Sequence, residues 1–280
     1  MPPRPAAVLA AVLLFAPLAA SAASVNNPNV PTGEGDAIFA VGEGGVLDPV
    51  AVRLHGKFLN PGSNEGEPSS KLRSESNASL LTAGSKVHVI FGGRTIATVP
   101  AKVENGAATI AIPPSLHLNL NVGALASPTL SGHAATPRRA PTAAERAAAL
   151  GAAAKSTGVA SPSRFEVSNL TAMDLGHGTA VVGTLNVRGT GTPRKDKRIF
   201  FIAEPVNGAL RTTLLNLQTI RVTEPLLEEV SEHLVDAIDL GDGTLSVVTR
   251  MTGYDAYTYA IYTRKSGGWK NVYTGGGVAA

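Results

Sequence analysis

The sequence predicts a mainly β protein, with antiparallel sheets in two modules and an Ala-rich helix in the linker that connects them. Short apolar segments with alternating polarity, such as Lys86–Phe91, are followed by Gly-rich turn signals. The chain contains 30 Gly and 19 Pro, which favours many turns over long helices. At Pro113-Pro114 a stretch rich in Ala, Pro, Ser and Thr begins. We therefore expect a small N-terminal β module (residues 23–112), a linker (113–163) and a C-terminal antiparallel β domain (164–280).

The first 22 residues have the pattern of a secretory signal peptide. Arg4 provides a positive charge, residues 6–20 form an apolar segment, and Ala20-Ser21-Ala22 fits the small-x-small cleavage rule. The mature chain would then begin at Ala23. A membrane anchor is the alternative, but the apolar run is shorter than the roughly 20 residues that a bilayer requires, and Pro17 interrupts it. We expect a secreted or periplasmic protein whose mature chain has no membrane span.

The composition excludes several classes of function. The sequence has no Cys, which rules out thiol catalysis, iron–sulfur clusters and Cys-based zinc sites, and which requires a fold that is stable without disulfide bonds. The formal net charge is +3, from 24 basic and 21 acidic residues. Removal of Arg4 with the signal peptide leaves about +2. A nearly neutral chain lacks the bulk positive charge of a nucleic-acid-binding protein, so no nucleic acid partner is expected.

In the N-terminal module, residues 24–35 form a polar leader and strand-like segments follow it. The segment 86–91 is joined through Gly92-Gly93 to a second segment, 94–103, and this arrangement predicts a β-hairpin. Asn105-Gly106 is a further turn signal. The expected strands of this module lie at residues 37–41, 50–54, 86–91, 94–103 and 107–112.

The linker contains one predicted helix. Thr142 and Glu145 have the spacing of a capping box, in which each side chain accepts a hydrogen bond from the backbone amide of the other residue. The Ala-rich segment 143–154 has high helix propensity, and Gly151 or Gly158 can end the helix. Few residues in this segment are larger than Ala, so we expect a spacer or a lid that lies on a sheet.

The C-terminal domain is expected to be antiparallel, with strands at residues 165–170, 179–187, 199–204, 210–220, 244–251, 257–263 and 269–273. Segment 225–238 is different, because its apolar residues recur every three or four positions, and this spacing predicts a helix. The basic run 194–198 (RKDKR) follows Gly and Pro residues and precedes an apolar strand. A solvated turn is the favoured interpretation, and a patch for an anionic surface polymer is the alternative.

Segment 174–184 (DLGHGTAVVGT) resembles the GHGT-x-V-x-G histidine motif of the subtilisin-like serine proteases. The resemblance implies that His177 is the general base of a serine-type hydrolase. The family also requires a Ser in a Gly-Thr-Ser context, and residues 243–246 (GTLS) depart from it; Asp48 is a poor match for the acid. The alternative is a β-turn at residues 176–178 that leads into a β-branched strand, in which case no catalytic residue is assigned.

Segment 236–243 (DAIDLGDG) resembles the Asp-Gly loops of FG-GAP and VCBS-type repeats, which are extracellular β modules. The resemblance implies that Asp239 and Asp242 are calcium ligands, since calcium requires several closely spaced oxygen atoms. Gly241 stands where the family has a liganding Asp, so one carboxylate is missing. The favoured alternative is an Asx-type turn between two strands, with no bound cofactor.

Aromatic residues gather near the C-terminus, and they are candidates for a binding surface. Tyr257 and Tyr259 share one face of the predicted strand, Tyr262 points to the other face, and Trp269 lies in the next strand. Aromatic rows on sheets stack sugars or partner peptides, but they also form cross-strand packing pairs, and packing is the favoured interpretation.

These patterns do not assemble a complete catalytic constellation. The sequence therefore favours an exported non-catalytic binding or structural protein of unknown ligand, with a cell-envelope polymer or a protein as its partner. The alternative is the serine-type hydrolase that uses His177.

Overall fold

The computed structural model describes residues 35–61, 80–81, 84–104, 107–113, 123–223, 230–253, 256–266 and 268–278, and it is mainly β with antiparallel sheets. The predicted signal peptide, the polar leader up to residue 34 and the turn at Asn105-Gly106 lie outside these ranges. Within the described ranges, no helix combines the length and the apolar character needed to span a bilayer.

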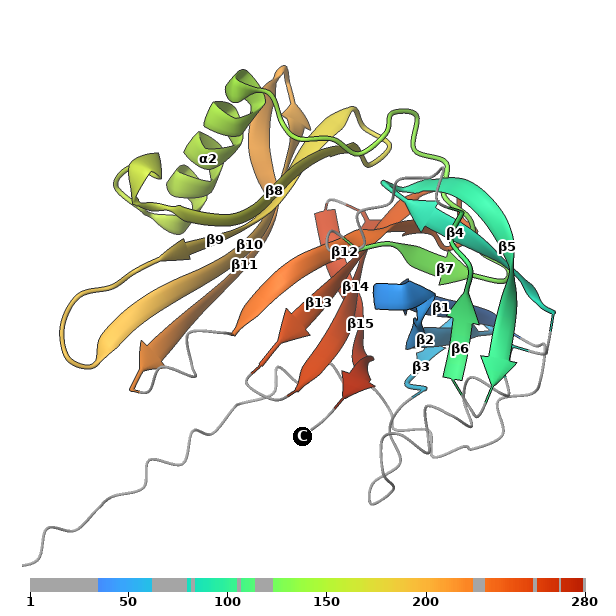
Figure 1. The fold of residues 1–280 in the computed structure, drawn as a ribbon. Coiled ribbons are helices and arrows are strands. Elements are labelled where there is room, and N and C mark those ends of the chain that lie inside the picture. The colour runs from blue at the N-terminus through green and yellow to red at the C-terminus, as the bar shows by residue number, and fades with distance from the viewer. Residues whose placement is uncertain are drawn as a thin grey trace, which may run out of the picture.

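The described strands form three sheets (Figure 1). The N-terminal sheet has the order β3-β2-β1-β7-β4-β5-β6, the helix-backed sheet β11-β10-β9-β8 and the middle sheet β12-β13-β14-β15. The strands of the N-terminal sheet are β1 (Asp36–Val41), β2 (Leu47–Leu54), β3 (Lys57–Leu59), β4 (Lys86–Phe91), β5 (Arg94–Glu104), β6 (Ala107–Ile110) and β7 (Leu125–Ser127). The other strands are β8 (Glu166–Asp174), β9 (Thr179–Val187), β10 (Arg194–Val206), β11 (Ala209–Val222), β12 (Ser231–Asp239), β13 (Leu245–Thr252), β14 (Tyr257–Lys265) and β15 (Gly268–Val278).

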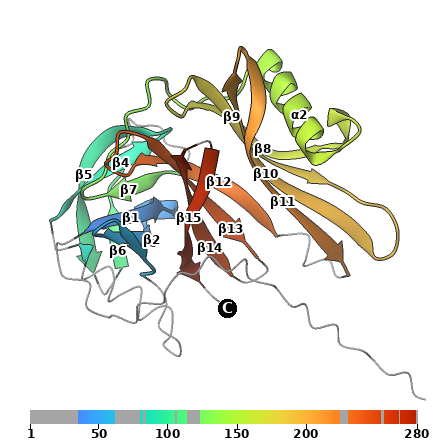
Figure 2. The same cartoon turned by 180° about the vertical axis from the view of Figure 1, so that it is seen from behind.

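The middle sheet is buried on both faces, and it holds the other two sheets together (Figure 2). On one face, Ala260 and Tyr262 join a hydrophobic cluster with Phe200 of the helix-backed sheet. On the other face, Tyr259 and Ile261 join a second cluster that contains residues of β1, β2 and β4. The sheet from the predicted C-terminal domain thus shares a hydrophobic core with the sheet from the predicted N-terminal module.

The two outer sheets have cores of their own. The N-terminal sheet curls, so that Val46 before β2 forms a β-bridge with Thr109 of β6, and a third cluster fills the space inside the curl. The outer face of the helix-backed sheet is covered by helix α2 (Ala143–Thr157), whose Ala149, Ala153 and Ala154 pack on Phe201 and its neighbours. The small Ala side chains let the helix lie close to the sheet.

Several predicted elements are confirmed. The hairpin of β4 and β5 has the expected pairing, from Phe91 opposite Arg94 to Lys86 opposite Pro100. Helix α2 begins with the predicted capping box between Thr142 and Glu145. It ends at Gly158, which adopts the left-handed conformation that glycine favours at this position. Strand β9 has the predicted bounds.

Two predictions are wrong. Segment 225–238 was expected to be helical, but its described part, from residue 230, enters strand β12. Both faces of this strand are buried and a bulge lies between Leu234 and Asp236, so its apolar residues do not alternate. The predicted linker, 113–163, contains β7, which lies between β1 and β4 at the centre of the N-terminal sheet. Strand β7 has three residues, too few to show a period in the sequence.

Asp236 connects the middle sheet to the β4–β5 hairpin. Its fully buried carboxylate accepts hydrogen bonds from the backbone amides of Gly92 (2.8 Å), Gly93 (2.8 Å) and Ala237 (2.7 Å). Gly92 and Gly93 both have positive φ, which turns their amides toward the carboxylate. Burial raises the pKa of Asp236 to about 6, although the nearby Arg138 guanidinium and the three amides favour the charged form.

The raised pKa of Asp236 predicts a specific pH dependence of stability. Between about pH 4 and pH 6 the folded protein binds a proton at Asp236 that the unfolded chain has released, so its contribution to stability falls as the pH rises. We expect Asp236 to account for a decrease of about 2 kcal/mol between pH 4 and pH 7. Urea unfolding at both pH values should show that the wild type and the exposed control Glu43→Gln lose about 2 kcal/mol more stability than Asp236→Asn does. An equal decrease in all three proteins would contradict the assignment.

Candidate functional site

His177 lies at the tip of the β8–β9 hairpin and is exposed. The flanking Gly176 and Gly178 both have φ of 90°, as the turn requires. Asp174 stabilises the turn, because its Oδ1 accepts from the amide of Gly176 (2.8 Å) and its Oδ2 accepts from the amide of Ala135 (3.0 Å). Among the described residues, no hydrogen bond or ion pair to the imidazole is present. Residues 176–178 form a bend that leads directly into strand β9.

Asp239 and Asp242 lie in the β12–β13 loop, and their carboxylates bond to the backbone of the loop itself. Oδ1 of Asp239 accepts hydrogen bonds from the amides of Gly241 (2.7 Å), Asp242 (3.1 Å) and Gly243 (3.1 Å), and its Oδ2 lies 3.3 Å from Nδ1 of His133. Oδ1 of Asp242 accepts from the amide and the hydroxyl of Thr244. The loop therefore has the Asx-type geometry. In the part of the chain that the structure describes, no cluster of three or more His, Asp or Glu residues could hold a metal ion.

The C-terminal aromatic residues pack between the sheets. Tyr259 and Trp269 are 1% and 8% exposed, so they do not form the predicted binding surface. The hydroxyls of Tyr257 and Tyr259 both donate to Oδ2 of Asp48 on β2, at 2.6 and 2.7 Å. The indole of Trp269 donates to Oε2 of Glu204 at 3.0 Å. These aromatic residues are buried because the middle sheet is covered on both faces. The alternation of residues within a strand does not reveal this coverage.

The basic run 194–198 is the first part of strand β10, so its interpretation as a solvated turn is wrong. Asp196 is 1% exposed, and its Oδ1 accepts from Nε of Arg194 (2.8 Å) and the amide of Gly189 (3.0 Å). Burial opposes ionisation of Asp196, but the hydrogen bonds from Arg194 and Gly189 and the charge of Arg198 together hold its pKa below the ordinary value. Asp196 therefore neutralises part of the positive charge of residues 194–198. The remaining positive charge of this run is not paired with Asp196.

Glu232, at the start of β12, is the centre of a buried polar network that the sequence did not indicate. Its Oε1 accepts from the hydroxyls of Thr249 (2.7 Å) and Tyr262 (2.9 Å), and its Oε2 accepts from Nδ2 of Asn216 (3.0 Å). Burial raises the pKa of Glu232, although its three donors favour the charged form. The network joins β12, β13 and β14 of the middle sheet to β11 of the helix-backed sheet. Glu232 is one of several acids in this part of the sequence, so no local pattern distinguishes it for this role.

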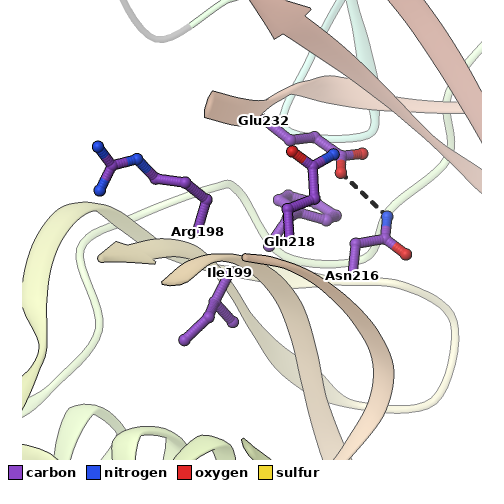
Figure 3. Close-up of a pocket in the computed structure, with 6 residues that line it drawn as sticks. Arg198, Ile199, Asn216, Gln218 and Glu232 are labelled. Carbon is purple, nitrogen blue, oxygen red and sulfur yellow. Dashed lines mark hydrogen bonds between the residues drawn. The ribbon is translucent and has the colours of Figure 1, made fainter. Parts of the chain in front are cut away.

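A small pocket lies beside Glu232, between the helix-backed and middle sheets (Figure 3). Its lining residues are Arg198, Ile199, Phe200, Asn216, Gln218 and Glu232. The cavity volume is about 10 Å³, which is room for about one water molecule. Pockets for small organic ligands usually have roughly 300–1,000 Å³. The pocket can hold a water molecule, and it is too small for an organic substrate or a polymer segment.

Glu204 on β10 forms a second buried connection between the same two sheets. It is 3% exposed, and it accepts from Trp269, from the guanidinium of Arg264 and from the hydroxyl of Thr213. The Arg264 guanidinium also lies 4.8 Å from the centre of the Trp269 ring. The three donors lie on β11, β14 and β15, so this carboxylate connects β10 to three other strands.

The predicted site residues do not converge on one place. His177 is in the β8–β9 hairpin, Asp239 and Asp242 are in the β12–β13 loop, and the aromatic residues are in the sheet layers. The two turns share one neighbour, because segment 131–135 contacts both Asp174 and Asp239. These contacts hold both turns in place.

No protein-family model, no curated protein and no solved structure matches this chain. The resemblance of segment 236–243 to FG-GAP and VCBS-type repeats therefore stays a prediction.

We expect Glu232→Ala to lower the free energy of unfolding by about 3 kcal/mol, because it removes the acceptor of three hydrogen bonds in a buried layer. Urea unfolding at pH 7 measures the effect. The matched control is Glu166→Ala, since Glu166 forms an exposed ion pair with Arg188 and its loss should change stability by less than about 1 kcal/mol. Equal losses in the two variants would show that the Glu232 network does not stabilise the fold.

The loop geometry also predicts the response to calcium. The carboxylates of Asp239 and Asp242 already accept hydrogen bonds from the loop, so calcium binding would require these bonds to break. We expect the melting temperature to be the same in millimolar calcium and in chelator. A calcium-dependent increase that disappears in Asp239→Asn would instead support the metal site.

Proposed function

We propose that this chain is an exported, non-catalytic binding or structural protein of the cell envelope or the extracellular space. The observation that carries the proposal is that the buried acids accept hydrogen bonds from other parts of the fold. Asp236, Glu232 and Glu204 each accept hydrogen bonds from several donors that belong to neighbouring strands or sheets. Buried carboxylates with shifted pKa values often mark active sites, but structural networks produce the same shifts.

The surroundings of the acids favour the structural role. A general acid or base must come within hydrogen-bond reach of a substrate atom. Glu204 and Asp236 lie in the packed layers between sheets, and the pocket beside Glu232 has a cavity volume of only about 10 Å³. These acids already accept hydrogen bonds from donors of the fold. This arrangement supports a protein that performs no reaction on a substrate.

Export is part of the same proposal. It is supported by the pattern of residues 1–22 and by the absence of Cys from the sequence, because such a fold needs no reducing environment. The extensive burial of the middle sheet supplies the stability that disulfide bonds provide in many small exported domains.

The competing function is a serine-type hydrolase with His177 as its base, and one experiment separates the two. The full chain with a C-terminal tag is expressed in a secreting bacterium, and the exported product should begin at Ala23. This product is treated with a fluorophosphonate probe, which labels serines activated by a histidine. We expect no labelling above that of heat-denatured protein. Labelling that disappears in His177→Ala would establish the hydrolase and reject the proposal, and a product retained in the cytoplasm with residues 1–22 intact would reject export.

A further inference from the structure

Strands β9, β10 and β11 run well past the C-terminal end of helix α2 (Figure 1), so part of the helix-facing side of this sheet is not covered by the helix. Leu217 of β11 lies on this uncovered part and is 41% exposed. Its paired neighbour on β10 is Ile199, which belongs to the cluster under the helix. The uncovered part therefore begins directly beyond the helix-covered core.

The side chains of β10 alternate between the two sides of the sheet. Ile199 and Phe201 pack toward the helix, so Lys197 and Lys195 lie on the helix-facing side. Arg221 of β11 is directly opposite Lys195. On this side of the described strands β9, β10 and β11, every charged side chain is a cation. We call Lys195, Lys197 and Arg221 the basic patch.

The acid in the same run does not neutralise the basic patch. Asp196 points to the other side of the sheet, where it bonds Arg194 and lies 3.7 Å from Arg198. Lys195 and Arg221 are exposed and face each other in register. Like charges in direct cross-strand positions destabilise a sheet. Such a pair of cations is expected at a site where a bound anion offsets their mutual repulsion.

Helix α2 extends the patch. Nζ of Lys197 donates to the carbonyl oxygen of Thr157, the last residue of the helix, at 3.3 Å. This bond fixes the lysine beside the end of the helix, where Lys155 is also exposed. The cations thus come from three elements and cover an area, with Lys197 about 7 Å along the strand from Lys195. An area of this kind fits a charged chain that lies across the strands.

The apolar content of the surface decides between possible partners. Protein interfaces depend on buried aromatic or aliphatic anchors, and membrane surfaces require several large apolar side chains. Among the described residues, only Val46 and Leu217 are exposed large hydrophobic residues, and only Leu217 is beside the patch. A partner that binds here must derive its affinity mainly from charge. In an exported protein, the corresponding ligand is an acidic polysaccharide.

We propose that the basic patch of Lys195, Lys197 and Arg221, at the end of helix α2, binds an acidic polysaccharide that carries one carboxylate on each repeating unit. This inference rests on the proposed function, and it names the class of ligand. The carboxylates bind the exposed cations as charge-assisted hydrogen bonds and ion pairs, and no covalent step is involved. Salt weakens such exposed pairs, so the affinity falls as the ionic strength rises.

The test measures binding of polygalacturonate to the mature chain by isothermal titration calorimetry at 50 and 300 mM NaCl. The double variant Lys195→Gln/Arg221→Gln should bind about tenfold more weakly at low salt. The matched control, Lys265→Gln/Lys270→Gln, loses the same two charges at exposed positions of the middle sheet and should bind like the wild type. Lys197→Gln serves as a second, independent variant and should also bind more weakly.

Thermal unfolding distinguishes lost binding from lost folding. Removal of a like-charge pair should leave the melting temperature of the patch variant unchanged or raise it by about 1–2 °C. Wild-type protein that does not bind polygalacturonate, or equal binding by patch and control variants, would overturn the inference. Tighter binding of poly-L-glutamate or duplex DNA would also overturn it. Each of these results leaves the labelling and export experiment of the proposed function to be judged separately.

Discussion

Burial of both faces of the middle sheet is the constraint on which the rest of the structure depends. Strands β12–β15 contribute side chains alternately to two hydrophobic clusters, one shared with the helix-backed sheet and one with the N-terminal sheet. Any buried polar side chain within these strands must find its partners inside the protein. Asp236 does so at the Gly92-Gly93 turn, and Glu232 does so with donors from both sheets. The hydrogen bonds to these acids fix the relative positions of the sheets. Purely apolar contacts define such positions less specifically.

The same constraint determines the role of several residues whose types are common in binding or catalytic sites. Tyr259, Trp269 and Glu204 have the residue types of a binding or catalytic site, yet each is saturated by partners in the fold. His177 has the motif of a general base, yet it stands at the tip of a hairpin. Tyr259, Trp269 and Glu204 are therefore used for packing between the sheets, whereas His177 is exposed.

Local signals in the sequence were sufficient for local structure. The capping box at Thr142, the glycine turn at Gly92-Gly93 and the alternation of β9 depend on residues close together in the chain. The burial of Tyr259 and the network of Glu232 depend on contacts between distant residues, such as the bond from Tyr259 to Asp48. Strand β12 was mistaken for a helix because the second covered face removed its alternation. Packing between sheets was the information that the sequence pattern lacked.

The basic run illustrates how an error about local structure changes an inference about function. In a turn, the five residues 194–198 would share one solvated surface, and Asp196 would partly neutralise its neighbours. In a strand, the period of two sorts them, so that Arg194, Asp196 and Arg198 lie on one side and the two lysines on the other. The side with the acid becomes a buried ion-pair cluster. The other side keeps only positive charge and meets Arg221, so the sheet itself concentrates cations that the composition of the chain, with a net charge of only +3, does not reveal.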